Sequence, residues 1–192
     1  MKKFALGFLL TAAMVLPGFS EANVGQPAPD FSAASSSGQT VKLSDYKGKY
    51  VVLEWTNYQC PFVKGQYDSG KMQAQQKKWT AQGVVWLTVC SSAEGKQGYL
   101  DAGATNQLLK DKGAAPTFSL LDTSGQVGHL YGAKTTPHMF VINPEGKVIY
   151  NGAIDDRKEK NYVDSALTEA RAGQTVSADQ TQPYGCGVKY SE

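Results

Sequence analysis

The chain has 192 residues, of which 41% are hydrophobic and 19% are charged, with a formal net charge of +2. This composition excludes a disordered chain, a collagen and a coiled-coil rod, and the length suits one domain with its own core. The nearly balanced charge gives no argument for nucleic acid or an anionic membrane surface as a partner.

The first 22 residues have the pattern of a secretory signal peptide. Two lysines precede an apolar run at residues 4–16, and we expect cleavage after Ala22. The run is shorter than the roughly 20 residues that span a bilayer, so we expect no stable membrane anchor. The sequence therefore predicts export to the periplasm, with a folded domain at residues 23–173 and a polar tail at 174–192 that carries Cys186.

The chain after residue 22 alternates apolar runs with helical patterns. It begins with an irregular segment at residues 23–38. The predicted strands are residues 40–43, 49–56, 84–89, 117–121, 139–143 and 147–150. The predicted helices are residues 61–80, 101–112, 124–131 and 160–172. Alternation of this kind predicts an α/β fold with a partly parallel sheet.

Three cysteines carry most of the chemical information: Cys60, Cys90 and Cys186. Their spacing matches no zinc-finger pattern, and we expect no metal site and no cofactor. In an oxidising compartment the odd count leaves one thiol over. Cys60 and Cys90 each stand at the carboxyl end of a predicted strand, where open α/β sheets place their chemistry.

Cys60 is the first catalytic candidate because it lies between a predicted strand and a predicted helix, with Pro61 in the first helical turn. A sulfur at that position faces the positive end of the helix dipole and free backbone N–H groups. Both favour the thiolate, which is the reactive form. We therefore expect Cys60 to be ionised and open to an incoming oxidised molecule; the alternative is a buried structural cysteine.

Glu54 is the second candidate, six residues before Cys60 in an apolar predicted strand. Burial would raise the pKa of its carboxyl group and suit it to proton transfer near the thiol. The alternative is an edge position with the side chain in water. Alternation along the strand places Val52 and Glu54 on one face, and Leu53 and Trp55 on the other.

Residues 135–138 form a predicted turn before a strand. The Thr136–Pro137 bond can be cis or trans on the sequence alone. We interpret His138 as a hydrogen-bonded surface residue rather than a ligand.

Taken together, the motifs resemble the thioredoxin superfamily, and more closely its secreted peroxiredoxin-like, or redoxin (AhpC/TSA-related), branch. In chain order the motifs are APDF at 28–31, LSDYKGK at 43–49, NYQCPFVK at 57–64, TP at 136–137, GAIDD at 152–156 and GCGVKY at 185–190. The resemblance implies a thioredoxin-like α/β fold: a central mixed sheet flanked by helices, with an N-terminal extension and a C-terminal tail.

The resemblance also implies roles for single residues. Cys60 falls at the place of the first active-site cysteine, and Glu54 where many thioredoxins carry a buried acid. Pro137 falls at the family's cis proline, and Thr136 before it would line the partner-binding groove. We therefore expect Pro61, Thr136 and Pro137 to contact the substrate.

The motif around Cys60 departs from both families. Val63 stands where thioredoxins carry a second cysteine, and Asn57 where peroxiredoxins carry a threonine. The partner of Cys60 is left open between Cys90 and Cys186. The resemblance favours Cys186, because the Gly-Cys-x-x-Lys-aromatic tail belongs to the family pattern, and we expect a flexible tail that swings to Cys60.

The sequence leaves three functions open. The first is a periplasmic thiol-disulfide oxidoreductase or thiol-based antioxidant, whose partners are protein or small-molecule thiols and disulfides, or peroxides. In it Cys60 forms a mixed disulfide or sulfenic acid that a second cysteine or an external thiol resolves. The second is a Cu(I)-binding module with Cys60, Cys90 and His138 as soft ligands. The third is a non-catalytic partner-binding domain.

Overall fold

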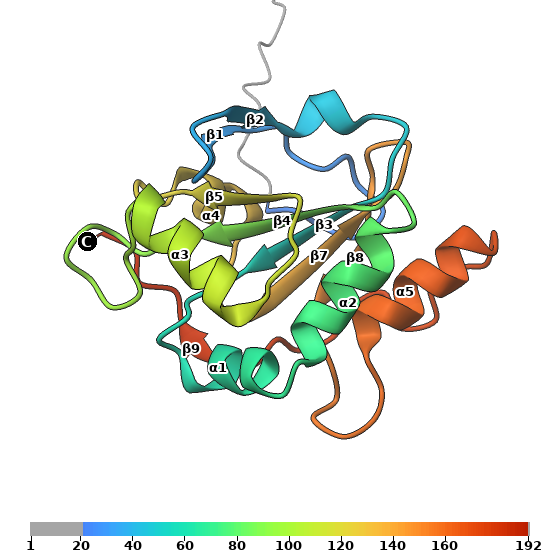
Figure 1. Cartoon of the computed structure of the whole chain (residues 1–192). Coiled ribbons are helices and arrows are strands. Elements are labelled where there is room, and N and C mark those ends of the chain that lie inside the picture. Colours follow the sequence, from blue (N-terminus) through green and yellow to red (C-terminus); the bar gives the residue numbers. More distant parts are fainter. Residues whose placement is uncertain (1–20, 192) are drawn as a thin grey trace, which may run out of the picture.

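A computed structural model describes residues 21–191 and shows a central five-stranded sheet flanked by helices (Figure 1). The strand order is β5 (Phe118–Leu121), β4 (Val85–Cys90), β3 (Val51–Trp55), β7 (His138–Ile142) and β8 (Val148–Gly152). The first three strands are parallel, while β7 and β8 run antiparallel to their neighbours. The predicted mixed sheet and the predicted hairpin at its end are confirmed. The predicted signal peptide lies outside the described residues except at its last two positions.

Different elements cover the two faces of the sheet. The helices are α1 (Pro61–Asp68), α2 (Lys71–Thr80), α3 (Ala102–Lys112), α4 (Gln126–Tyr131) and α5 (Tyr162–Arg171). Side chains of α1, α2 and α5 pack on the face that holds Val52, while α4 packs on the face that holds Leu53 and Trp55. The alternation predicted along β3 is thus confirmed.

The predicted helix at residues 61–80 is two helices. Gly70 separates α1 from α2 with φ +75°, a left-handed conformation that a glycine adopts without steric cost and that ends the helical path. The segment predicted to be irregular also holds a strand, β1 (Ser32–Ala34), which pairs with β2 (Thr40–Lys42) and is followed by the 3₁₀ helix η1 (Leu43–Tyr46). No helix within residues 21–191 is long and apolar enough to cross a membrane.

The C-terminal tail is ordered, which contradicts the prediction of a flexible segment. Its strand β9 (Cys186–Gly187) pairs antiparallel with β6 (Thr135–Thr136). Further along, the ring of Tyr190 stacks on His129 with centroids 4.0 Å apart, and its hydroxyl donates to the Ala133 carbonyl at 2.8 Å. The tail is therefore anchored at Cys186 and beyond it, and the cysteine lies beside Cys60 without a swinging segment.

Candidate redox-active site

The loop between β3 and α1 holds Cys60 at the start of a helix. Cys60 is the N-cap residue of α1, and its N–H donates to the Asn57 carbonyl at 2.9 Å. The Asn57 side chain fixes the same loop, because its oxygen accepts from the Gln59 N–H at 2.9 Å and its amide donates to the Gln97 carbonyl at 3.1 Å. The strand–cysteine–helix arrangement predicted from the sequence is therefore confirmed.

Cys186 is the thiol that the structure brings to Cys60. The two sulfur atoms lie 2.7 Å apart, and the Cys60 sulfur lies 3.1 Å from the Thr136 carbonyl oxygen. Thr136 is the register partner of Cys186 in the β6–β9 pair, so this short ladder sets the position of the second sulfur. A disulfide bond is about 2.05 Å long, and only a small shift separates the two free thiols from a bridge.

Cys60 is not open to solvent as the sequence predicted. Its side chain is fully buried, whereas Cys186 is partly exposed. The physical reason is the ordered tail, which places β9 and its cysteine next to the sulfur. In this arrangement an incoming molecule meets Cys186 before Cys60.

The two thiols differ in acidity. Burial raises the pKa of the Cys60 thiol, but hydrogen bonds from the Cys186 thiol and from the backbone N–H groups of Val63 and Cys186 outweigh burial and hold that pKa below its ordinary value. The pKa of Cys186 is raised to about 11, first by desolvation and then by its hydrogen bond with Cys60. Of the two thiols, Cys60 at the helix start therefore loses its proton at the lower pH.

Glu54 is fully buried in β3, so the water-exposed alternative is wrong. Its carboxylate accepts hydrogen bonds from the Tyr67 hydroxyl at 2.8 Å, the Gln76 amide at 3.0 Å and the Trp86 indole at 2.8 Å. Desolvation is the largest influence and raises the pKa of Glu54 to about 7, while the three hydrogen bonds lower it. The Glu54 carboxyl group can therefore gain or lose a proton near neutral pH.

The route from Glu54 to the cysteine loop is indirect. The Tyr58 hydroxyl donates to the Tyr67 hydroxyl at 3.3 Å, and Tyr67 in turn donates to Glu54. Tyr58 lies two residues before Cys60. Within residues 21–191 no hydrogen bond joins Glu54, Tyr67 or Tyr58 to a sulfur, so this chain of hydrogen bonds ends in the cysteine loop, short of the thiol.

Cys90 ends β4, beside the strand that leads to Cys60, and its surroundings differ. Its thiol donates to the Gly98 carbonyl at 3.4 Å, and desolvation raises its pKa. Among the described residues it forms no hydrogen bond with another sulfur. Of the two partners left open for Cys60, the structure brings Cys186 into contact and leaves Cys90 apart.

His138 is buried at the start of β7, so its predicted surface position is wrong. Its Nδ1 accepts from the Lys134 N–H at 3.2 Å, and its Nε2 bonds to the Asn151 side-chain oxygen at 2.7 Å. Both ring nitrogens are therefore occupied within the protein. In the described part of the chain no group of three His, Cys, Asp or Glu side chains is placed to hold a metal ion, which leaves the Cu(I) alternative without support.

The residues predicted to line a substrate groove differ in exposure. Pro61 is exposed, whereas Thr136 and Pro137 are buried where β9 pairs with β6. The Thr136–Pro137 peptide bond is cis, which answers the question that the sequence left open.

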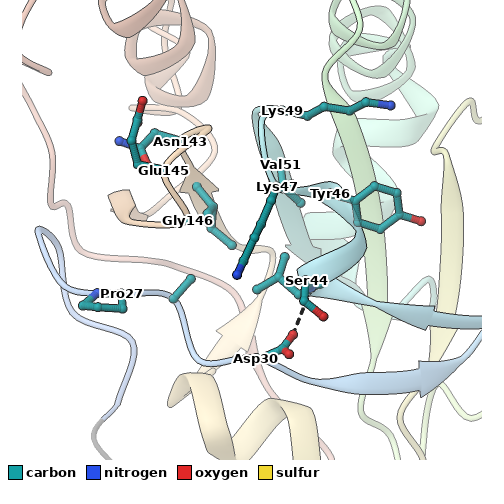
Figure 2. Close-up of a pocket in the computed structure, with 13 residues that line it drawn as sticks. Pro27, Asp30, Ser44, Tyr46, Lys47, Lys49, Val51, Asn143, Glu145 and Gly146 are labelled. Carbon is teal, nitrogen blue, oxygen red and sulfur yellow. Dashed lines mark hydrogen bonds between the residues drawn. The ribbon is translucent and has the colours of Figure 1, made fainter.

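A hollow at the other end of the sheet is a separate feature. It opens where β3 begins, between the β7–β8 turn and η1, and the Lys47 side chain extends into it (Figure 2). Asp30 borders it and accepts from the Ser44 N–H at 3.0 Å. Cys60 follows the opposite end of β3 and none of the lining residues is a cysteine or histidine, so this hollow is separate from the thiol site.

Several contributors to the site were not predicted. Tyr67 and Gln76 hold the Glu54 carboxylate, and Asn57 fixes the cysteine loop through its side chain. Helical spacing places Tyr67 and Gln76 on the buried faces of α1 and α2, but that pattern gives no sign of a shared partner. The one available signal was the polar Gln76 among apolar helix positions.

Comparisons with known proteins agree with this geometry. A sequence profile described as the AhpC/TSA family matches residues 24–151. Thiol-disulfide oxidoreductase ResA of Bacillus subtilis (strain 168) is 34% identical over 146 residues, which cover 76% of this chain and 75% of that protein.

Solved structures share the fold. An uncharacterized conserved protein from Geobacillus kaustophilus matches with a TM-score of 0.80 at 23% identity, covering 88% of this chain and 93% of that one. A putative thiol:disulfide interchange protein DsbE from Chlorobium tepidum matches with a TM-score of 0.54 at 30% identity, covering 68% and 85%. The predicted thioredoxin-like fold class is therefore confirmed.

Proposed function

The chain belongs to the AhpC/TSA family, and we propose that it is a thiol-disulfide oxidoreductase that works through Cys60 and Cys186. The observation that carries this proposal is the pair of sulfur atoms 2.7 Å apart at a helix start, with the lower pKa on the buried partner. The relative ResA, named as a thiol-disulfide oxidoreductase, supports the same class of reaction.

The difference in exposure suggests how exchange proceeds from the oxidised protein. An external thiolate attacks Cys186, the partly exposed sulfur of the Cys60–Cys186 disulfide, and forms a mixed disulfide with it. The S–S bond breaks and Cys60 leaves as a thiolate, which is the favoured leaving group because its pKa is the lower. A second external thiolate then attacks the external sulfur of the mixed disulfide. One external disulfide is released, and Cys186 takes up a proton.

The reverse sequence oxidises the protein. Cys186 transfers its proton to the neighbouring Cys60 thiolate and attacks the external disulfide, which releases one thiolate. Cys60 passes that proton to the released thiolate and attacks Cys186. It displaces the second thiolate, which takes a proton from water, and the internal disulfide closes. Two electrons pass from the protein to the external disulfide, which becomes two thiol groups.

Glu54 supplies a buried proton store behind the cysteine loop in this proposal. Its pKa of about 7 lets it gain or lose a proton near neutrality, and the Tyr67–Tyr58 chain connects it with the loop. Pro61 starts the helix that stabilises the Cys60 thiolate. Thr136 pairs with Cys186 in the β6–β9 ladder, and Pro137 follows Thr136.

The proposed location is the periplasm, after removal of residues 1–22. The basic start, the short apolar run and the small residues before the cleavage point support export. A disulfide between Cys60 and Cys186 would persist in an oxidising compartment.

The test is turnover of a small disulfide by the reduced protein. We expect the protein to lose two of its three thiols for each 2-hydroxyethyl disulfide consumed, measured by alkylation after acid quenching. A parallel reaction with hydrogen peroxide measures the antioxidant alternative under the same conditions. If Cys60 stays reduced in both reactions, the oxidoreductase proposal fails, and a domain that only binds partners remains.

A further inference from the structure

Two aromatic rings border the pair of cysteines. Phe62 follows Cys60 by two residues in the first turn of α1, and Tyr184 precedes Cys186 by two residues in the tail. Two residues of chain span at most about 7 Å, so each ring belongs to a residue close to one sulfur. The ring centroids lie 5.7 Å apart. Phe62 is 42% exposed and presents this aromatic pair to solvent.

Arg157 lies over both rings. Its guanidinium carbon is 4.2 Å from the ring centroid of Tyr184 and 5.5 Å from that of Phe62, within the range of cation–π attraction. Arg157 is itself exposed and reaches this place from the loop between β8 and α5. The rings thus hold a positive charge next to two residues that flank the cysteines in the chain.

No carboxylate among residues 21–191 forms an ion pair with this guanidinium. Asp155, two residues before Arg157 in the loop, is buried and accepts from the Gln66 amide at 2.7 Å, from the Tyr184 hydroxyl and from the backbone N–H of Arg157 at 3.0 Å. Its oxygens are therefore occupied by neutral donors. The guanidinium keeps its N–H groups available to a carboxylate from outside.

The backbone at Arg157 is unusual as well. With φ +62° it is the one residue other than glycine with a positive φ in the described part of the chain. A glycine adopts that conformation more easily than a residue with a side chain. The loop nevertheless places there one of only two arginines in the chain.

We propose that Arg157 makes the site selective for small anionic disulfides and thiols, by holding a carboxylate of the substrate while the substrate sulfur meets Cys186. An arginine suits this task because its planar guanidinium stays charged and can bind both oxygens of a carboxylate. The inference rests on the proposed thiol-disulfide exchange and adds the substrate class. Arg157 is a specificity-determining residue and takes no part in the electron transfer.

Three disulfides of similar size separate the effect of charge. Dithiodipropionate is anionic, 2-hydroxyethyl disulfide is neutral and cystamine is cationic. We expect Arg157→Gln to lower kcat/KM for dithiodipropionate about three- to fivefold, the effect of one exposed ion pair. The value for 2-hydroxyethyl disulfide should stay within about 1.5-fold, and that for cystamine should not fall. The loss for dithiodipropionate should shrink at 1 M salt, where the screening length is about 3 Å.

Two control variants remove the same charge elsewhere. Lys158→Gln acts on the next residue of the loop, and Arg171→Gln acts on the other arginine, which lies near Trp79. Neither control variant should change the order of the three disulfides by kcat/KM. If Arg157→Gln slows all three equally, or changes none, the selectivity proposal is wrong while the exchange reaction stands. If the unchanged protein reacts with none of them, the proposed function itself is overturned, and this inference with it.

Discussion

Cys60 and Cys90 follow parallel neighbouring strands to the same edge of the sheet, and yet they are chemically different. The pKa of Cys60 is lowered, whereas the pKa of Cys90 is raised. Cys60 caps a helix and touches a second sulfur; Cys90 ends its strand and bonds to a loop carbonyl, with the next helix starting only at Ala102. A strand end therefore brings a thiol to the right edge, and the helix start and partner sulfur distinguish one thiol from the other.

Replacing each cysteine by serine should give the largest contrast. We expect Cys60→Ser to reduce completed disulfide exchange by roughly a thousandfold or more, since no thiolate remains to displace the external sulfur from Cys186. Cys90→Ser should retain activity within about twofold, because its thiol contacts neither partner. Rates with 2-hydroxyethyl disulfide measure both. Equal losses in the two variants would contradict the distinction.

The order of attack can be tested with the same variants. In Cys60→Ser the external sulfur should remain trapped on Cys186, because no thiolate is left to displace it. In Cys186→Ser the buried Cys60 should form the mixed disulfide slowly. Intact-mass measurement after reaction identifies the trapped adduct in each. Rapid labelling of Cys60 in the second variant would mean that Cys60 is the sulfur attacked first.

A smaller effect should follow from moving the tail strand. Gly185 has φ +138°, and a Cβ there would lie 2.0 Å from the Thr136 carbonyl oxygen. Gly185→Ala should displace β9 and slow closure of the Cys60–Cys186 disulfide about 10- to 100-fold, since small misplacements of reacting atoms are costly. Quenched-flow alkylation gives the closure rate.

The matched control lies two residues away. At Gly187 a Cβ would meet no atom within 4 Å, and the residue has no positive φ, so Gly187→Ala should close its disulfide at the unchanged rate. A similar slowing in both variants would mean that the tail tolerates no substitution, whatever its contact with Thr136. No slowing in Gly185→Ala would mean that β9 does not position Cys186.

The last comparison concerns the pH dependence of stability, through Glu54 on the strand that leads to Cys60. Its pKa is about 7 in the fold against an ordinary 4.5, so the folded state binds the extra proton in that range. The contribution of Glu54 to the free energy of unfolding is therefore fully present below about pH 4.5. It falls by about 3 kcal/mol as the pH rises to about 7. Glu54→Gln should abolish this loss, as measured by denaturant unfolding across pH.

His138 changes the free energy of unfolding with pH in the opposite direction, so the same experiment must take it into account. Desolvation lowers its pKa to about 4 from 6.5, so the unfolded state binds the extra proton between these values and stability rises with pH there, also by about 3 kcal/mol. The unchanged protein should thus vary little between pH 4.5 and 6.5. In Glu54→Gln the stability should rise with pH over this range, because only the His138 contribution remains. If the stability of the variant does not change with pH, one of the two pKa shifts is wrong.

Much of this arrangement follows from local sequence pattern. Apolar runs and helical spacing predicted all five strands of the main sheet, and the Cys60-Pro61 pair predicted the helix start. Burial of Glu54 followed from its apolar strand. Such features depend on residues a few positions apart, and a single sequence contains them directly.

The rest depends on contacts between distant residues. The burial of Cys60 results from a strand 126 residues further along the chain, so local pattern suggested an exposed sulfur. The order of the tail depends on Tyr190 stacking on His129, and neither residue predicts the other. Likewise the place of Arg157 over Phe62 and Tyr184 joins three separate segments. None of these pairings has a signature in periodicity or composition.

Identification of the cysteines that pair in the oxidised protein tests the central claim most directly. The native protein is oxidised, its free thiols are alkylated without reduction, and its peptides are identified by mass spectrometry. We predict one peptide pair joined through Cys60 and Cys186, with Cys90 fully alkylated. A bridge between Cys60 and Cys90, or an alkylated Cys60, would contradict the account.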